Sequence, residues 1–323
     1  MGPFLDAHRH AEHRLRNVTH SDLMIGGIGL LMLVSSFLLW SWAGILVALV
    51  SVGVLLLLGP RVRPETVMRL YRAEPVGPRH GTQLLRIVEV LADRAELGSH
   101  PRLFVVPSMT LNAFATGTPE RAAIALTEGL LRRLSLRELA GVIAHEMSHI
   151  RNNDLFVMGL ADAMTRFTQL LSYVALALAM LNIPALLLGL DTFSWTAILL
   201  LYLAPAASSL LQLGLSRTRE FDADLEAAGL TGDPAGLASA LRSLERSQGR
   251  FWEDLMIPPT RRVPYPSLLR SHPETSDRVA RLADVGRHPL AHPIELVEEP
   301  MFSMVGLGPA EMTPRRRWPG LWY

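Results

Sequence analysis

Two long stretches of the chain contain no charged residue, and each exceeds the length of one membrane-spanning helix. The first runs from Leu23 to Pro60, with tryptophans on both sides of Ser41 at its centre. A single helix of that length would overshoot a bilayer, which needs about 20 residues, and tryptophan favours the membrane interface. The pattern predicts two short spans, roughly 22–40 and 43–59, joined by a tight turn. One kinked span with an interfacial segment is the alternative.

The second apolar stretch follows a polar middle region. Phe167 to Leu190 is uncharged, Asp191 interrupts it, and Thr192 to Ser216 is again uncharged. Each half is long enough to span, and proline is tolerated in membrane helices. We therefore expect a second membrane hairpin, and a buried hairpin of a soluble domain is the alternative.

Arginines flank both hairpins, whereas neither connecting turn contains one. The flanking arginines nearest the spans are Arg14, Arg16, Arg61, Arg63, Arg166 and Arg217. Because basic residues concentrate on the cytoplasmic side of membrane proteins, we expect both termini in the cytoplasm. The hypothesis is a multi-pass protein of the inner (plasma) membrane with four transmembrane helices.

The polar region between the hairpins has the pattern of a small α+β unit. Thr82 to Ala95 has apolar residues at helical spacing, whereas the short apolar runs Pro101–Pro107 and Ala122–Thr127 are typical of strands. No glycine-rich phosphate loop is present. The expected fold class is thus a mainly α membrane protein with a cytoplasmic α+β domain containing a small sheet.

The next helix is marked by its own start signal. Ser135 and Glu138 form an S-x-x-E capping box. Apolar residues then recur at helical spacing and predict a buried face: Leu139, Val142, Ile143 and Ile150.

This helix contains the H-E-x-x-H motif, formed by His145, Glu146 and His149. Histidines four residues apart lie on one face of a helix, so both imidazoles can reach one metal ion. Glu146 lies beside them, where a carboxylate can take a proton from an attacking water. Two surface histidines on an amphipathic helix are the alternative.

Composition narrows the partners and the metal chemistry. The 323 residues are 49% hydrophobic and only 19% charged, which favours a membrane protein. A net charge of +1 gives no support for a nucleic-acid partner. Since there is no cysteine, a zinc site here must use His, Asp, Glu and water.

A third metal ligand has to come from another helix. Glu220 and Asp224 are four residues apart, just after the second apolar stretch. Glu220 could bind the metal, and Asp224 could accept a hydrogen bond from a ligating imidazole. An exposed ion pair of Glu220 with Arg217 or Arg219 explains the spacing equally well, so both interpretations stay open.

Four motifs in order resemble the HtpX-like membrane zinc metallopeptidases, which are gluzincins related to the prenyl-protein proteases. The resemblance covers roughly residues 60–285. The motifs are Asn112–Gly117, His145–His149 with Asp154, Ser216–Asp224, and Ser271–Pro273 with Arg278. A membrane hairpin separates the second motif from the third.

The resemblance implies a zincin-like catalytic domain and a role for each matched position. One zinc ion per chain would be held by His145, His149 and Glu220, with Glu146 as general base. Asp224 and Asp154 would support these ligands. His272 and Arg278 would lie at the mouth of the site and stabilise the oxyanion. The substrate-binding edge strand would comprise Asn112, Ala113, Phe114 and Ala115.

The implied function is a zinc-dependent endopeptidase that cleaves membrane or misfolded proteins at the cytoplasmic face, in protein quality control. Its partners would be protein substrates and the lipid bilayer, with no nucleic acid, and a homo-oligomer is left open. The alternative is a non-catalytic scaffold or holdase that retains zinc. The expected layout is a tail (1–21), a first hairpin (22–60), a catalytic domain in two segments (61–164 and 216–287) separated by a second hairpin (165–215), and a proline-rich tail (288–323).

Overall fold

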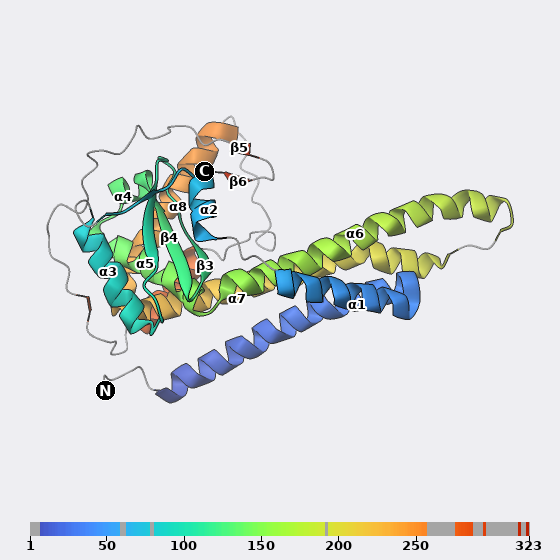
Figure 1. The fold of residues 1–323 in the computed structure, drawn as a ribbon, viewed down its shortest axis with the longest axis horizontal. Helices are drawn as coiled ribbons and strands as arrows, with labels where there is room; N and C mark the ends of the chain where they lie inside the picture. The colour runs from blue at the N-terminus through green and yellow to red at the C-terminus, as the bar shows by residue number, and fades with distance from the viewer. Residues whose placement is uncertain are drawn as a thin grey trace.

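A globular α+β domain sits at one end of the molecule, and three long helices project from it (Figure 1). The computed structural model describes residues 7–58, 63–77, 81–190, 193–256, 275–286, 293–294, 316–317 and 321–322. The projecting helices are α1 (Ala7–Leu58), α6 (Asp154–Leu187) and α7 (Trp195–Thr231). By length and apolar composition, three helices of the described chain can cross a membrane: Thr19–Val54, Asp154–Leu187 and Trp195–Thr231.

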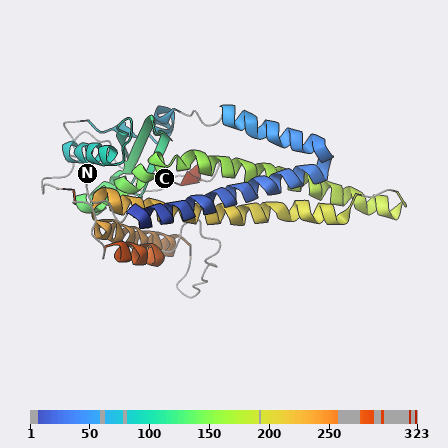
Figure 2. The same cartoon turned by 90° about the horizontal axis from the view of Figure 1, so that it is seen from below.

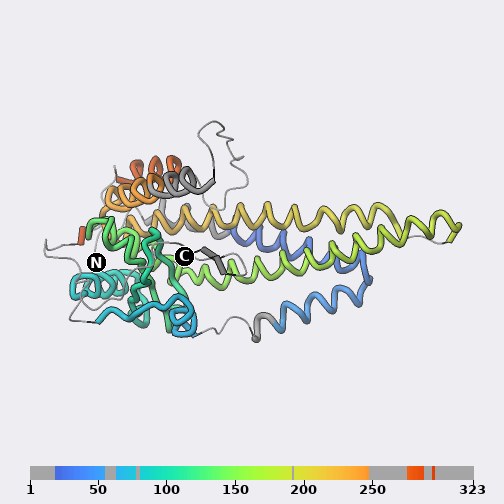
Figure 3. The backbone as a smooth tube through the Cα atoms, turned by 90° about the horizontal axis from the view of Figure 1, so that it is seen from above, coloured from blue at the N-terminus to red at the C-terminus, as the bar shows by residue number. Residues whose placement is uncertain are grey.

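Helix α1 is interrupted at the position where the sequence predicts a turn. Trp40 and Ser41 leave helical backbone angles, with φ −134° and +53°. Figures 2 and 3 show the second half of α1 running back towards the globular domain. A Cβ on Gly44 would lie 1.9 Å from the carbonyl oxygen of Ser36, so this close approach requires glycine. Whether both halves span the membrane stays a prediction.

Helices α6 and α7 form the second hairpin. Their outward apolar side chains, such as Leu170, Leu176 and Leu199, are more than half exposed, as expected for a lipid-facing surface. The buried amide of Asn182 on α6 donates to the carbonyl of Phe193 (2.8 Å) and accepts from the N–H of Phe193 (2.9 Å), which ties α6 to the residue two positions before α7.

The globular domain contains a four-stranded mixed sheet in the order β1-β2-β4-β3. Its strands are β1 (Glu74–Pro75), β2 (Arg102–Val106), β3 (Ala113–Thr118) and β4 (Arg121–Thr127). β2 and β4 are parallel, and β3 runs antiparallel to β4 with Ala115 opposite Ile124. Thus β3 is an edge strand, as the family resemblance implies.

Helices cover this sheet and extend the domain: α2 (Pro64–Leu70), α3 (Thr82–Arg94), α4 (Glu128–Arg133), α5 (Leu136–Arg151), α8 (Pro234–Met256) and α9 (Thr275–Val285). Two short strands near the C-terminus, β5 (Arg316–Arg317) and β6 (Leu321–Trp322), pair with each other. The main core gathers buried apolar side chains of α3, α5, α8 and the sheet.

Helix α5 lies at the centre of this core and begins with the expected capping box. The Ser135 hydroxyl accepts from the N–H of Glu138, and the Glu138 carboxylate accepts from the N–H of Ser135 at 2.8 Å. A Cβ on Gly141 would lie 2.9 Å from the Cα of Leu237, so the small residue lets α8 approach closely. The mainly helical membrane fold with a small sheet is confirmed, and its placement on the cytoplasmic side stays a prediction.

Candidate metal centre

The two histidines of the H-E-x-x-H motif point in the same direction from α5. The Nε2 atoms of His145 and His149 lie 3.2 Å apart. His145 is buried, and His149 is half-buried at the wall of a cavity. The surface-histidine alternative is therefore wrong for this helix.

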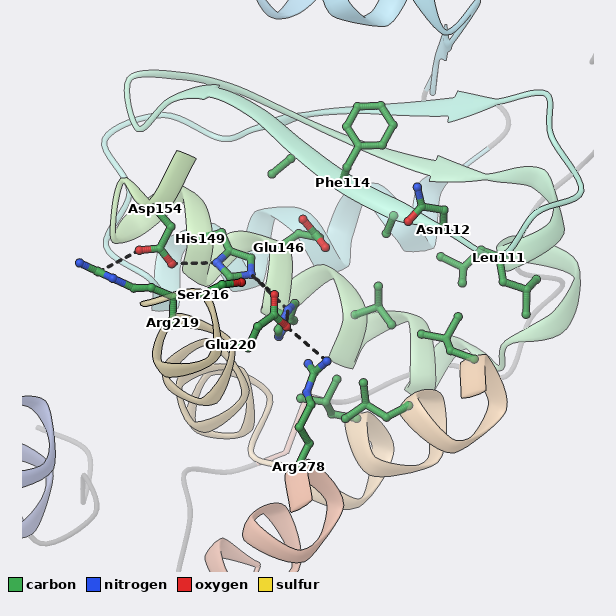
Figure 4. Close-up of a pocket in the computed structure, with 18 of the residues that line it drawn as sticks. Leu111, Asn112, Phe114, Glu146, His149, Asp154, Ser216, Arg219, Glu220 and Arg278 are labelled. Atoms are coloured by element: carbon green, nitrogen blue, oxygen red, sulfur yellow. Dashed lines mark hydrogen bonds and ion pairs between the residues drawn. The ribbon is translucent and has the colours of Figure 1, made fainter. Parts of the chain in front are cut away.

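Helix α7 brings Glu220 to the same point (Figure 4). Its Oε2 lies 3.6 Å from Nε2 of His145, and its Oε1 lies 3.9 Å from Nε2 of His149. A tetrahedral zinc ion with ligands at 2.0–2.1 Å would separate them by about 3.3 Å. The three side chains form a group that could hold a metal ion, and their spacing and chemistry fit zinc.

Each histidine has a carboxylate on its other ring nitrogen. Nδ1 of His149 pairs with Oδ2 of Asp154 at 2.8 Å, and Nδ1 of His145 lies 3.1 Å from Oδ1 of Asp224. Such contacts orient imidazoles so that Nε2 faces the metal. Asn153 makes the first contact possible, because its left-handed φ of +53° turns the chain sharply between α5 and α6.

Two arginines neutralise these carboxylates. Arg219 donates to Oδ1 of Asp154 at 2.9 Å. Arg278, on α9, donates twice to Asp224 and lies 3.2 Å from Oε2 of Glu220. Glu220 thus pairs with an arginine of another helix, Arg278, whereas Arg219 forms an ion pair with Asp154.

The charges around His149 change its proton affinity. Burial alone would lower the pKa of His149, but the hydrogen bond to Asp154 and the surrounding carboxylates outweigh burial and raise it to about 9. In the metal-free protein this imidazole is therefore a cation at neutral pH.

Glu146 borders a cavity of about 540 Å³ together with the histidines. Figure 4 shows it between His149 and the strand that carries Phe114. Residues of the predicted edge strand, Asn112 to Ala115, line the same cavity. The cavity therefore joins the candidate general base, the candidate ligands and an edge strand.

Part of the cavity wall is apolar. It is lined by leucines and a valine from three helices: Leu130, Val142, Leu237, Leu241 and Leu244. This surface was not predicted from the sequence, although the spacing of Leu237, Leu241 and Leu244 places them on one face of α8.

The structure brings most of the predicted site residues together. His145, Glu146, His149, Asp154, Glu220, Arg278 and residues 112–115 all line the cavity, and Asp224 contacts two of them. His272 lies outside the described residues. Arg219 was predicted only as a partner for Glu220, because a separation of 65 residues hides its contact with Asp154.

Comparison with known proteins decides the family. Residues 78–285, more than half of the chain, match peptidase family M48. The chain belongs to this family. A protein of Acaryochloris marina described as "Protease HtpX homolog" is 39% identical over 273 residues, covering 80% of this chain and 91% of that protein. A relative with the same description from Kineococcus radiotolerans is 37% identical over 297 residues, covering 84% and 97%.

Among solved structures, the crystal structure of S. mikatae Ste24p aligns with a TM-score of 0.46 and 23% identity. The alignment covers 84% of this chain and 66% of that chain.

Family membership confirms the resemblance to HtpX-like proteases. This M48 peptidase family is one of metalloproteases, so a metal cofactor is implied, and the group of His145, His149 and Glu220 fits one. With its three apolar helices, the chain is a membrane metallopeptidase.

Proposed function

We propose that the protein is a membrane-integrated, zinc-dependent endopeptidase. The observation that carries the proposal is the convergence of His145, His149 and Glu220 beside Glu146, in a cavity bordered by β3. A catalytic zinc ion typically has three protein ligands and one open position. This donor set meets that requirement.

The chemistry divides between the metal and the chain. A bound zinc ion supplies a Lewis acid that acidifies water and polarises the peptide carbonyl. Glu146 takes the proton of the attacking water and then gives it to the leaving amine. The carboxylates of Asp154 and Asp224 keep the ring orientations of the two histidines.

We assign the remaining matched residues to substrate and transition state. The edge of β3 at Asn112–Ala115 would hold an extended peptide through backbone hydrogen bonds, which suits broad sequence tolerance. Arg278, which lines the cavity, would also offset negative charge that develops during attack. His272 would share that role, as the family resemblance implies.

The membrane arrangement of the proposal follows the charge pattern. Four spans, formed by the two halves of α1 with α6 and α7, would leave both termini and the site in the cytoplasm. The layout is an N-terminal tail (1–21), membrane hairpins at 22–60 and 165–215, a catalytic domain split between 61–164 and 216–287, and a C-terminal tail (288–323). Substrates would be membrane or misfolded proteins, cleaved in quality control at the inner membrane.

A non-catalytic scaffold with structural zinc is the second candidate. Structural zinc sites are normally closed by four protein ligands, and the described group has three. A scaffold also has no need for Glu146 at the cavity wall. Both features favour the enzyme.

The decisive experiment measures casein cleavage and zinc content of detergent-purified protein. Wild type should bind one zinc ion per chain and cleave casein, and a chelator should abolish cleavage. Glu146→Gln should retain zinc and lose activity, because only the base is removed. Glu220→Ala should lose both. Full activity of Glu146→Gln would overturn the enzyme mechanism, and full zinc occupancy after substitution of all three ligands would overturn the site.

A further inference from the structure

Glu226 forms a three-way contact that the chemistry of the site does not use. This residue lies on α7, six residues beyond Glu220. Its Oε2 accepts from the Ser148 hydroxyl at 2.5 Å and from Nδ2 of Asn152 at 2.6 Å. Its Oε1 accepts from Nη1 of Arg151 at 2.5 Å. One carboxylate thus takes hydrogen bonds from three side chains at the end of α5.

The contact lies next to the candidate ligands without touching them. Ser148 is fully buried and directly precedes His149 in the chain. A second contact, from Arg219 on α7 to Asp154 just after α5, ties the same two segments together on the ligand side. Helix α7 is therefore attached to the end of α5 through Glu226 and to the first residue of α6 through Arg219, and His149 lies close in sequence to both contacts.

We infer that Glu226 is a positioning residue for the metal centre, an inference that rests on the proposed zinc-dependent function. Two ligands belong to α5 and the third belongs to α7, so the geometry of the site depends on how these helices are set against each other. The Glu226 carboxylate fixes α5 in rotation and in register, because its donors occupy two successive turns. Without it, His149 and Glu220 would be held less closely to coordinating distance.

The expected size of the effect follows from the strictness of metal coordination. Ligand distances must agree with ideal values within about 0.2 Å. Loss of groups that orient ligands typically weakens metal binding about 10–100-fold. Glu226→Ala should therefore raise the zinc dissociation constant by about that factor. Once zinc is saturating, much of the kcat should return.

Asp233 offers a matched control at the other end of α5. Its carboxylate accepts two hydrogen bonds from Arg137 of α5 and one, at 3.1 Å, from the N–H of Gly236. Its side chain is 23% exposed, compared with 20% for Glu226. Both carboxylates bind an arginine of α5, and Asp233 does so far from the metal ligands. Asp233→Ala should lower thermal stability and leave the zinc dissociation constant within about twofold of wild type.

The experiment titrates zinc into full-length, metal-free protein in detergent, in competition with a chromophoric chelator. The inference predicts weaker zinc binding for Glu226→Ala, a smaller loss for Glu226→Gln, which keeps one acceptor, and an unchanged constant for Asp233→Ala. It is overturned if Glu226→Ala binds zinc as wild type does, or if Asp233→Ala weakens binding equally.

Ser148→Ala covers the case in which Glu226→Ala does not fold. This change removes one donor and no charge, so the protein should remain folded with a modest loss of zinc affinity. An unchanged zinc constant in Ser148→Ala would then reject the inference. Because metal affinity is measured without substrate, wild type that binds zinc but cleaves nothing would defeat the proposed enzyme and leave this inference standing.

Discussion

The guanidinium of Arg278 meets the carboxylate of Asp224 in a two-pronged hydrogen bond, with Nε to Oδ2 and Nη2 to Oδ1 both at 2.6 Å. Both residues are buried. Oδ1 of Asp224 continues to Nδ1 of His145 at 3.1 Å. A cation on α9 is thereby linked, through one carboxylate of α7, to a candidate ligand of α5.

This chain of contacts predicts a large effect of Arg278→Ala. The change removes the guanidinium that pairs with the buried carboxylate of Asp224, and breaking a buried ion pair typically costs about 3–5 kcal/mol of stability. Loss of the positive charge should also lower kcat on the order of 100-fold. Thermal unfolding and casein hydrolysis at saturating zinc measure the two effects. Arg278→Lys should keep the positive charge without the two-pronged geometry, so its unfolding temperature and kcat should be intermediate. Wild-type stability of Arg278→Ala would contradict the prediction.

The open edge of β3 can be tested by proline substitution. The carbonyl of Asn112 accepts from the N–H of Thr127 at 3.0 Å. Because antiparallel strands alternate in their bonding direction, Phe114 also bonds towards β4, and the backbone groups of Ala113 and Ala115 point away from β4. Ala113→Pro should therefore raise KM or abolish cleavage while leaving zinc bound.

Phe114→Pro is the control for this experiment. It removes an N–H from the β3–β4 ladder, so it should lower the thermal unfolding temperature. Unfolding by Ala113→Pro to the same extent would show that this edge is structural.

The apolar part of the cavity wall predicts a preference for large apolar side chains next to the scissile bond. Leu244 is half-buried at this surface, so a charge there can be tolerated by the fold. Leu244→Glu should reduce kcat/KM for a leucine-containing peptide about 10–200-fold relative to its alanine counterpart. The kcat/KM for a lysine-containing peptide should increase in the same variant. Peptides that differ at one position provide the measurement, and an unchanged ranking would refute the assignment.

The raised pKa of His149 predicts proton release on metal binding. With a pKa of about 9, the imidazole is protonated at neutral pH, whereas a ligating histidine must be neutral. Zinc binding near pH 7.5 should therefore release about one proton from this residue. Calorimetry in buffers of different ionisation enthalpy measures it, and His149→Gln should release less.

The same shift fixes the sign of a stability change in the metal-free protein. A pKa raised from 6.5 to about 9 stabilises the fold fully below pH 6.5, and this contribution is lost as pH rises through 9. The unfolding temperature of chelator-treated protein should fall over that window. Zinc-loaded protein should lack this decline, and a rise in stability over the same window would contradict the assignment.

The membrane arrangement predicts the location of four reporter fusions. Reporters at residue 10 and at the C-terminus should be cytoplasmic, and reporters inserted at residues 41 and 193 should be exported. An exported C-terminal reporter would require an odd number of spans.

Gly44→Val should reduce folded yield, since even a Cβ would lie 1.9 Å from the Ser36 carbonyl oxygen.

The sequence by itself determined the features that depend on near neighbours in the chain. The capping box of Ser135, the shared face of His145 and His149, and the reversal at Trp40 and Ser41 follow from helical periodicity and apolar length. Strands β2 and β4 were also found near their predicted positions. Such patterns are local, so no knowledge of packing was needed.

Only the tertiary structure decided which distant charges pair. From its spacing alone, Glu220 could be either a metal ligand or the ion-pair partner of Arg217 or Arg219. The packing of α7 on α5 directs Glu220 towards the histidines, and Arg219 pairs with Asp154 instead. The contacts of Glu226 and the apolar part of the cavity wall also arise from the packing of these helices. The angle and register at which two helices pack decide which side chains meet. The periodicity of a single helix specifies neither the packing angle nor the register.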